Sequence, residues 1–185
     1  VGSVRRYLSA VFDRPIGDIL PYYDTIGFLD IDGVLQNKHQ FLYTGWAGNT
    51  ASHFMADPIE VAESYDKTTV AFLHKFSKKA KMKWYLCSQQ RIIIPPQAVN
   101  YWGKLIGIDI VGVTPNLGDR NKEIEEILKF IDYKGTALIM DDEPATLSKE
   151  WSYFQPSISI SNPLSIPQME NICAKFNVNF MDLMG

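Results

Sequence analysis

The sequence predicts an α/β domain built on a mostly parallel central sheet with helices on both faces. Strand-like apolar runs alternate with helical patterns along the chain, which is typical of a parallel sheet covered on both sides. Three of the strand-like runs end in polar residues, as strands do at the ligand-binding edge of such a sheet. The chain has 185 residues, 46% of them hydrophobic, so it fits one domain with a modest insertion and a sizeable core.

Short runs of apolar and β-branched residues predict the strands. The first run is interrupted by Gly27 and carries Asp30 and Asp32 at its end, and the second closes at Ser88. A Ser-Ile-Ser-Ile run predicts the last strand. The predicted strands lie at 26–31, 82–87, 108–113, 136–140 and 157–160.

Apolar residues spaced three and four positions apart predict the helices. The clearest amphipathic pattern places Ile124, Ile127, Leu128 and Ile131 on one helical face. The predicted helices cover 67–80, 97–106, 120–131 and 165–176.

These elements make one predicted domain at 23–176. Residues 36–66 show no clear period and contain Gly and Pro, so we predict a long loop or small flap inserted after the first strand. Residues 1–22 are predicted as an N-terminal extension with a short amphipathic helix at 4–12, and residues 177–185 as a C-terminal tail.

Composition limits the class of protein. The net charge of -3 does not indicate the basic face of a non-specific nucleic-acid binder, although a local basic groove is compatible with it. Cys87 and Cys173 lie far apart and are predicted to be buried thiols in a reducing compartment. The sequence has no apolar stretch of membrane-spanning length and no opening signal segment, so we expect a cytoplasmic protein without a membrane partner.

The segment Phe-Leu-Asp-Ile-Asp-Gly-Val-Leu at 28–35 is the most informative for function. In a regular strand, Asp30 and Asp32 would lie on the same face, where their charges repel unless a proton or a cation compensates. Mg²⁺ prefers such oxygen ligands. A solvated turn is the simplest alternative. A calcium loop is excluded, because its fifth and twelfth positions would be Val34 and Phe41.

Polar side chains at three predicted strand ends would meet at one edge of the sheet. Beside them, Arg120 and Lys122 open a predicted helix, where a cation and the helix N-terminus can hold an anion. Phosphoryl transfer needs this combination, because a metal neutralises the phosphate, a carboxylate attacks it and a second acid protonates the leaving group. The strand-end residues are Asp30 and Asp32, then Ser88, then Asp141 and Asp142.

In this order, the motifs resemble the haloacid dehalogenase (HAD) superfamily of phosphatases over about residues 26–145. The resemblance implies a Rossmann-like three-layer α/β/α fold with a small flap or cap insertion. Within the superfamily, the chain is most similar to the HAD domain of Swiss Army Knife RNA repair proteins. The matching segments are LCSQQR (86–91), RNKEI (120–124) and LIMDDE (138–143), with Gln90 where that family has tryptophan.

The resemblance implies catalytic roles for four residues. Asp30 matches the nucleophile that forms an aspartyl-phosphate, and Asp32 matches the general acid and base. Ser88 would hydrogen-bond the phosphoryl group. As the cation that neutralises the phosphate we favour Lys122, in competition with Arg120, which matches the family's helix-start arginine.

The resemblance also implies a Mg²⁺ cofactor. Asp142 would bind the metal directly, Asp141 would support it or ligate through water, and Asp32 would contribute its backbone carbonyl. Arg91 would grip the phosphate or another part of the substrate, and Gly33 would form the tight turn after the nucleophile. The implied metal ligands are Asp30, Asp32, Asp141 and Asp142.

Structural interpretations stay open for several of these residues. Ser88 is also typical of a turn or helix N-cap, and Arg91 of a surface salt bridge. The pair Asp141 and Asp142 also fits a polar turn. A cation at a helix start is often a solvated charge, although it opposes the helix dipole there.

The resemblance implies a Mg²⁺-dependent phosphohydrolase acting on a phosphorylated small molecule such as a nucleotide, or on a nucleic-acid end. The alternative is a non-catalytic HAD-fold module that binds a nucleotide or a partner. His39 and His53 could touch substrate. Aromatic residues of the predicted flap would either stack on a base or form the flap's own small core: Phe41, Tyr43, Trp46 and Phe54.

Overall fold

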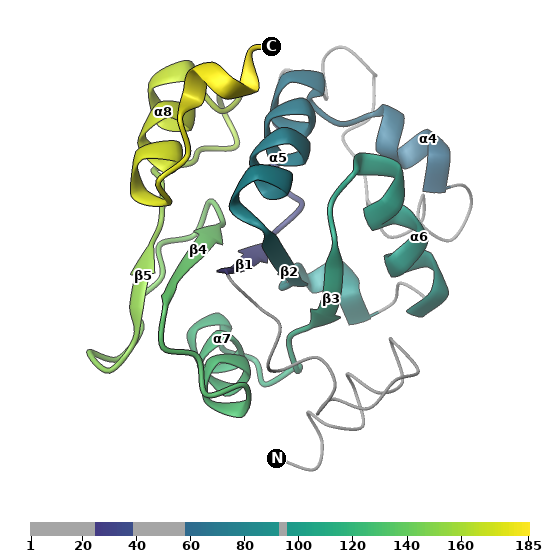
Figure 1. Ribbon diagram of the computed structural model, residues 1–185. Coiled ribbons are helices and arrows are strands. Elements are labelled where there is room, and N and C mark those ends of the chain that lie inside the picture. Colours follow the sequence, from purple (N-terminus) through teal and green to yellow (C-terminus); the bar gives the residue numbers. More distant parts are fainter. Residues whose placement is uncertain (1–24, 39–57, 93–95) are drawn as a thin grey trace.

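Figure 1 shows the computed structural model, which describes residues 25–38, 58–92 and 96–185. Within these ranges the strands form one all-parallel sheet of five strands in the order β3-β2-β1-β4-β5. The prediction of a parallel α/β sheet is therefore confirmed. The strands are β1 (Thr25–Leu29), β2 (Met82–Leu86), β3 (Ile110–Val113), β4 (Thr136–Met140) and β5 (Ser152–Phe154).

Helices cover both faces of the sheet. Alternate residues of each strand point to opposite sides, so both faces carry apolar side chains that must be buried. In β4, Leu138 and Met140 join the core packed by α5, α6 and α8, whereas Ala137 and Ile139 join the core packed by α7 (Figure 1). The helices are α4 (Pro58–Glu63), α5 (Lys67–Ala80), α6 (Pro96–Ile106), α7 (Arg120–Phe130) and α8 (Ile166–Lys175), with 3₁₀ turns η3 (Gln89–Ile92) and η4 (Phe180–Leu183).

The last and the first predicted strands differ from the structure in ways that affect the edge of the sheet and the site. The last strand is β5 rather than 157–160, because Ser152 to Phe154 pair with Thr136 to Leu138 along the free edge of β4. In the predicted strand, the pairing found among the described residues is an isolated bridge between Ser159 and Asn162. The first strand ends at Leu29 instead of residue 31.

The segments at both ends of the predicted domain have different outcomes. The predicted C-terminal tail contains η4, whose Leu183 is buried and whose carbonyl accepts a hydrogen bond from Lys75 Nζ at 2.9 Å. In the predicted flap, the structure describes its beginning and α4 at its end. The predicted helix at 4–12 and the flap residues 39–57, with their histidines and aromatics, lie outside the described residues.

The strand order creates a switch point between β1 and β4. The chain builds β2 and β3 on one side of β1, then crosses to the other side to add β4 and β5. In open α/β sheets, ligands bind in the crevice outside the carboxyl ends of the strands at such a point. The fold thus directs attention to the residues that follow Leu29 and Met140.

Two further predictions can be compared with the described part of the chain. Cys87 and Cys173 are both buried and form no disulfide, as predicted. None of the described helices has the length and apolar character needed to cross a bilayer.

Candidate active site

Three carboxylates meet at the switch point. Asp30 follows β1, and its N–H donates to the Met140 carbonyl at 2.9 Å, which extends the β1–β4 ladder by one residue. Asp141 and Asp142 follow β4. One carboxylate oxygen from each of these three aspartates lies within 4.8 Å of the others. Residues 30 and 141, which are far apart in the sequence, therefore lie in one site, as expected from their places at strand ends.

Burial makes these carboxyl groups hard to ionise. The pKa of Asp30 is raised to about 8, mainly by desolvation and then by the neighbouring Asp141, while Arg120 acts in the opposite direction. Desolvation also raises the pKa of Asp141 and of Asp142. Asp30 and Asp141 are buried, whereas Asp142 is half-buried. The cluster is therefore short of positive charge.

The cation against this cluster is Arg120. Its Nη1 contacts the Asp141 carboxylate directly and lies 3.9 Å from Asp30 Oδ2. Burial alone would lower the pKa of Arg120, but Cys87 and the surrounding acids raise it above its usual value. Lys122, which we had favoured, is exposed, and among the described residues no ion pair joins its side chain to an acid. The structure thus places Arg120, and not Lys122, against the aspartates.

A tight turn follows Asp30. Gly33 has φ +81° and donates its N–H to the Gln36 carbonyl at 2.8 Å. A Cβ at Gly33 would overlap the Asp142 carboxylate, so only glycine lets the turn approach the metal-ligand candidate this closely. The turn therefore packs the 28–35 segment against the residues that follow β4.

Asp32 lies in this turn rather than in a strand. Because β1 ends at Leu29, the alternation rule used for Asp30 and Asp32 does not apply to them. Asp32 is half-buried and forms a bridge with Gln36. Its carboxylate is not part of the cluster formed by the other three aspartates.

Ser88 and Arg91 follow β2 but differ from the expectations. Ser88 is 1% exposed. Arg91 is 2% exposed, and its guanidinium donates to the carbonyls of Ser88 at 2.8 Å, Thr114 at 2.9 Å and Pro115 at 2.9 Å. It also pairs with Glu123 at 2.8 Å. Arg91 therefore forms neither the surface salt bridge nor the open substrate contact that we considered.

Sequence reasoning overlooked Glu123, which is completely buried beside Arg120. The signal was present in the helical period. One face of α7 carries positions 120, 123, 124, 127 and 128. Arg120 and Glu123 therefore lie on the same inward face as the apolar residues, and Lys122 does not.

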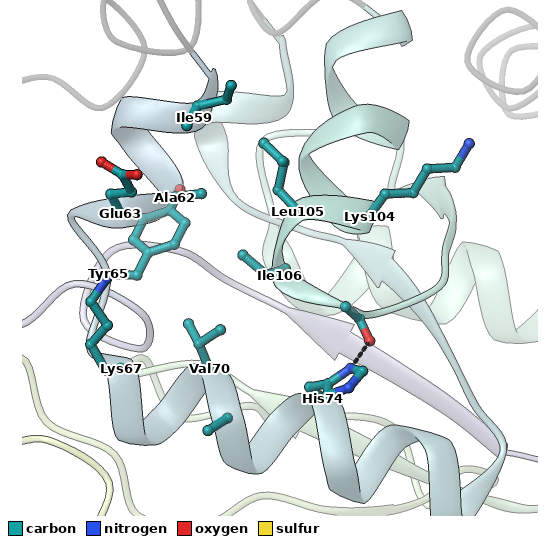
Figure 2. Close-up of a pocket in the computed structure, with 12 residues that line it drawn as sticks. Ile59, Ala62, Glu63, Tyr65, Lys67, Val70, His74, Lys104, Leu105 and Ile106 are labelled. Atoms are coloured by element: carbon teal, nitrogen blue, oxygen red, sulfur yellow. Dashed lines mark hydrogen bonds between the residues drawn. The ribbon is translucent and has the colours of Figure 1, made fainter.

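A separate hollow lies among the helices (Figure 2). It has a volume of about 580 Å³ between α4, α5 and α6, with Val70, Leu105 and Ile106 among its apolar lining. His74 closes one end by a hydrogen bond of 2.7 Å between Nδ1 and the Gly107 carbonyl (Figure 2). None of the predicted site residues lines this hollow.

The donor set at the switch point fits a hard divalent cation. Three carboxylates converge, and Arg120 balances only one of their charges. Comparisons of this chain with family models, with curated proteins and with solved structures gave no match.

Proposed function

We propose that the protein is a Mg²⁺-dependent phosphohydrolase that acts through an aspartyl-phosphate on a nucleotide or a polynucleotide terminal phosphate. One observation carries the proposal: Asp30 meets Asp141, Asp142 and Arg120 at the carboxyl ends of β1 and β4. The same residues carry the resemblance to HAD phosphatases.

The carboxylates of Asp30, Asp141 and Asp142, with the backbone carbonyl of Asp32, would hold the metal. When bound, Mg²⁺ supplies positive charge that favours ionised carboxylates and neutralises a phosphoryl oxygen. That charge matters here because burial raises the pKa of Asp30 to about 8, and a protonated carboxyl group is a poor nucleophile.

The protein's own residues perform two substitutions at phosphorus. In the first, a carboxylate oxygen of Asp30 bonds to phosphorus as the ester oxygen leaves and takes a proton from Asp32. In the second, Asp32 removes a proton from water, whose oxygen attacks phosphorus and releases phosphate from Asp30. Arg120 would stabilise the charge on the phosphoryl oxygens throughout. The partial exposure of Asp32 suits a group that must meet both the leaving group and water.

A second candidate is a non-catalytic module that binds a nucleotide or a partner in the same acidic crevice. It is favoured by the contact between Arg120 and Asp141, because this ion pair already neutralises part of the cluster without any metal. In that case Asp30 would never be phosphorylated.

The experiment measures phosphate release from p-nitrophenyl phosphate with Mg²⁺ and with EDTA. Wild type and Asp30→Asn are compared, with Asp132→Asn as the matched control because Asp132 is an exposed aspartate beyond α7. Release that requires Mg²⁺, persists in the control and falls at least about 10³-fold in Asp30→Asn supports the proposal.

A panel of nucleotides and of 3′- and 5′-phosphorylated oligonucleotides then identifies the substrate class. Failure to release phosphate from the generic ester and from the whole panel would contradict the hydrolase. Binding of a panel member without turnover would favour the binding module.

A further inference from the structure

Behind the carboxylate cluster, Arg91 and Glu123 form a fully buried ion pair. The distance from Arg91 Nη2 to Glu123 Oε2 is 2.8 Å, and neither side chain is exposed to solvent. A buried pair of this kind is weak support for stability by itself, because desolvation offsets much of the attraction between the charges. The contacts of this pair therefore point to a role other than stability.

Arg91 ties together the ends of β2 and β3. Its Nη1 donates to the carbonyls of Cys87 at 3.2 Å and Ser88 at 2.8 Å, which follow β2. Its Nε and Nη2 donate to the carbonyls of Thr114 and Pro115, both at 2.9 Å, which follow β3. One planar guanidinium with fixed donor directions thus sets the distance between the two loops.

Glu123 connects the same unit to the start of α7. Its Oε1 accepts the N–H groups of Leu117 at 2.9 Å and Gly118 at 3.2 Å, which hold the loop that leads into the helix. Its Oε2 lies 4.0 Å from Nε of Arg120, one helical turn earlier. That Nε is buried and has no hydrogen-bond partner among the described residues.

The charges alternate from the interior to the carboxylates. Arg91 is followed by Glu123, then by Arg120, and then by Asp141 and Asp30. Removing the negative charge of Glu123 would leave two arginines facing each other in a buried region. The orientation of Arg120 therefore depends on Glu123 behind it as well as on the aspartates in front of it.

We propose that the Arg91–Glu123 pair positions Ser88 and Arg120 for binding the phosphoryl group without touching the substrate. This inference rests on the proposed function and assigns Arg91 and Glu123 as positioning residues of that reaction. It also explains why Arg91 is an arginine, because a lysine ammonium has three donors and cannot donate to four carbonyls at once.

The test compares wild type with Glu123→Gln, which keeps an acceptor for the two loop N–H groups but removes the charge. Its matched control is Ser77→Ala, which deletes the buried 2.9 Å hydrogen bond from Trp84 Nε1 on the opposite face of the sheet. We expect Glu123→Gln to lower kcat about 10- to 100-fold and to raise the inhibition constant of inorganic phosphate about 10-fold. Ser77→Ala should change neither quantity, although it destabilises the fold.

A second readout does not require turnover. In ¹⁵N NMR, the Nε–H signal of Arg120, assigned by its loss in Arg120→Lys, should be that of an ordered side chain in wild type and in Ser77→Ala. In Glu123→Gln, its heteronuclear NOE should fall towards that of exposed arginines. If Glu123→Gln does not fold, Glu123→Asp tests the same point, because it keeps the charge but withdraws it from both arginines.

The two proposals fail differently. An inactive wild type would contradict the phosphohydrolase, and the NMR comparison would still decide whether Glu123 orders Arg120. Unchanged kcat, unchanged phosphate inhibition and an unchanged Arg120 signal in the folded Glu123 variant would overturn the positioning role.

Discussion

At the scale of single residues, the buried carboxyl group of Asp30 links protonation to stability. Its ordinary pKa is 3.8, and in the metal-free fold it is about 8, chiefly because of desolvation. Between these values the folded protein retains a proton that the unfolded chain has lost, so the free energy of unfolding falls as the pH rises. The contribution of the Asp30 carboxyl group to the free energy of unfolding is therefore complete below about pH 4 and is lost as the pH passes through about 8.

We therefore predict that Asp30→Asn raises the Tm of the metal-free protein, and that the gain is larger at pH 8 than at pH 5. Asparagine has nearly the same shape but no charge to desolvate. Each kcal/mol should appear as about 2–4 °C in Tm. Thermal unfolding in EDTA measures the effect, with the exposed Asp132→Asn as control. An equal gain at both pH values would contradict the raised pKa of Asp30.

A second prediction concerns the glycine of the turn. Gly33 and Gly118 have φ values of +81° and +78°, so alanine at either position should cost about 1–2 kcal/mol of backbone strain. A Cβ at Gly118 meets nothing within 4 Å, whereas one at Gly33 overlaps Asp142. Gly33→Ala should therefore also weaken Mg²⁺ binding, measured by titration calorimetry. Equal Mg²⁺ affinities in the two variants would contradict the prediction that the Gly33 turn supports the metal site.

The sequence predicted the three aspartates of the cluster because each lies within two residues of a strand end, and strand ends converge in a parallel sheet. The choice between Arg120 and Lys122 needed a different rule. Both residues open the same helix, but only Arg120 lies on its apolar stripe and can reach the acids. The buried role of Arg91 could not be predicted, because its partners are backbone carbonyls contributed by two separate loops.

At the scale of elements, the first turn of α7 carries the cation of the site. Asp119 caps this helix, and its carboxylate accepts the N–H groups of Asn121 at 2.9 Å and Lys122 at 3.3 Å. Arg120 lies between the cap and these N–H groups. The capping interaction therefore fixes the backbone from which Arg120 reaches the aspartates.

We predict that Asp119→Ala lowers both stability and activity. The lost cap should cost about 0.5–2 kcal/mol, and a frayed first turn should reduce kcat several-fold. Asp66→Ala is the matched control, because Asp66 caps α5 through Thr69 N at 2.8 Å but begins a helix without site residues. Urea unfolding and phosphate-release kinetics check the pair. A similar loss of kcat in both variants would indicate general destabilisation.

The sequence located α5 and β4 correctly because each has a clear local pattern, which is helical spacing of apolar residues in α5 and a short apolar run in β4. The predicted bounds of α5 coincide with the observed Lys67–Ala80, and those of β4 with Thr136–Met140. The last strand was misplaced because Ser-Ile-Ser-Ile has β-branched alternation, which is only a local signal. What determines β5 is its pairing with β4, and strand pairing is a non-local contact.

At the scale of the whole molecule, a cation at the switch point would bind only the folded protein and not the unfolded chain, since its ligands follow strands that are distant in sequence. Binding of this kind stabilises by mass action. We predict that Mg²⁺ at about 100 times its Kd raises Tm by about 5–10 °C relative to EDTA. The shift should be strongly reduced in Asp142→Asn and preserved in Asp132→Asn, as measured by differential scanning calorimetry. An undiminished shift in Asp142→Asn would place the cation elsewhere.

The junction between β1 and β4 also has a consequence for how the chain folds and unfolds. Phe28 of β1 pairs with Ile139 of β4, so this is a contact of high sequence separation. A nascent chain that has not yet made β4 has no crevice at this edge. If β1 and β4 join after the rate-limiting step, Mg²⁺ would leave the folding rate unchanged and would act by slowing unfolding. The ion would then serve as a kinetic lock on the finished fold.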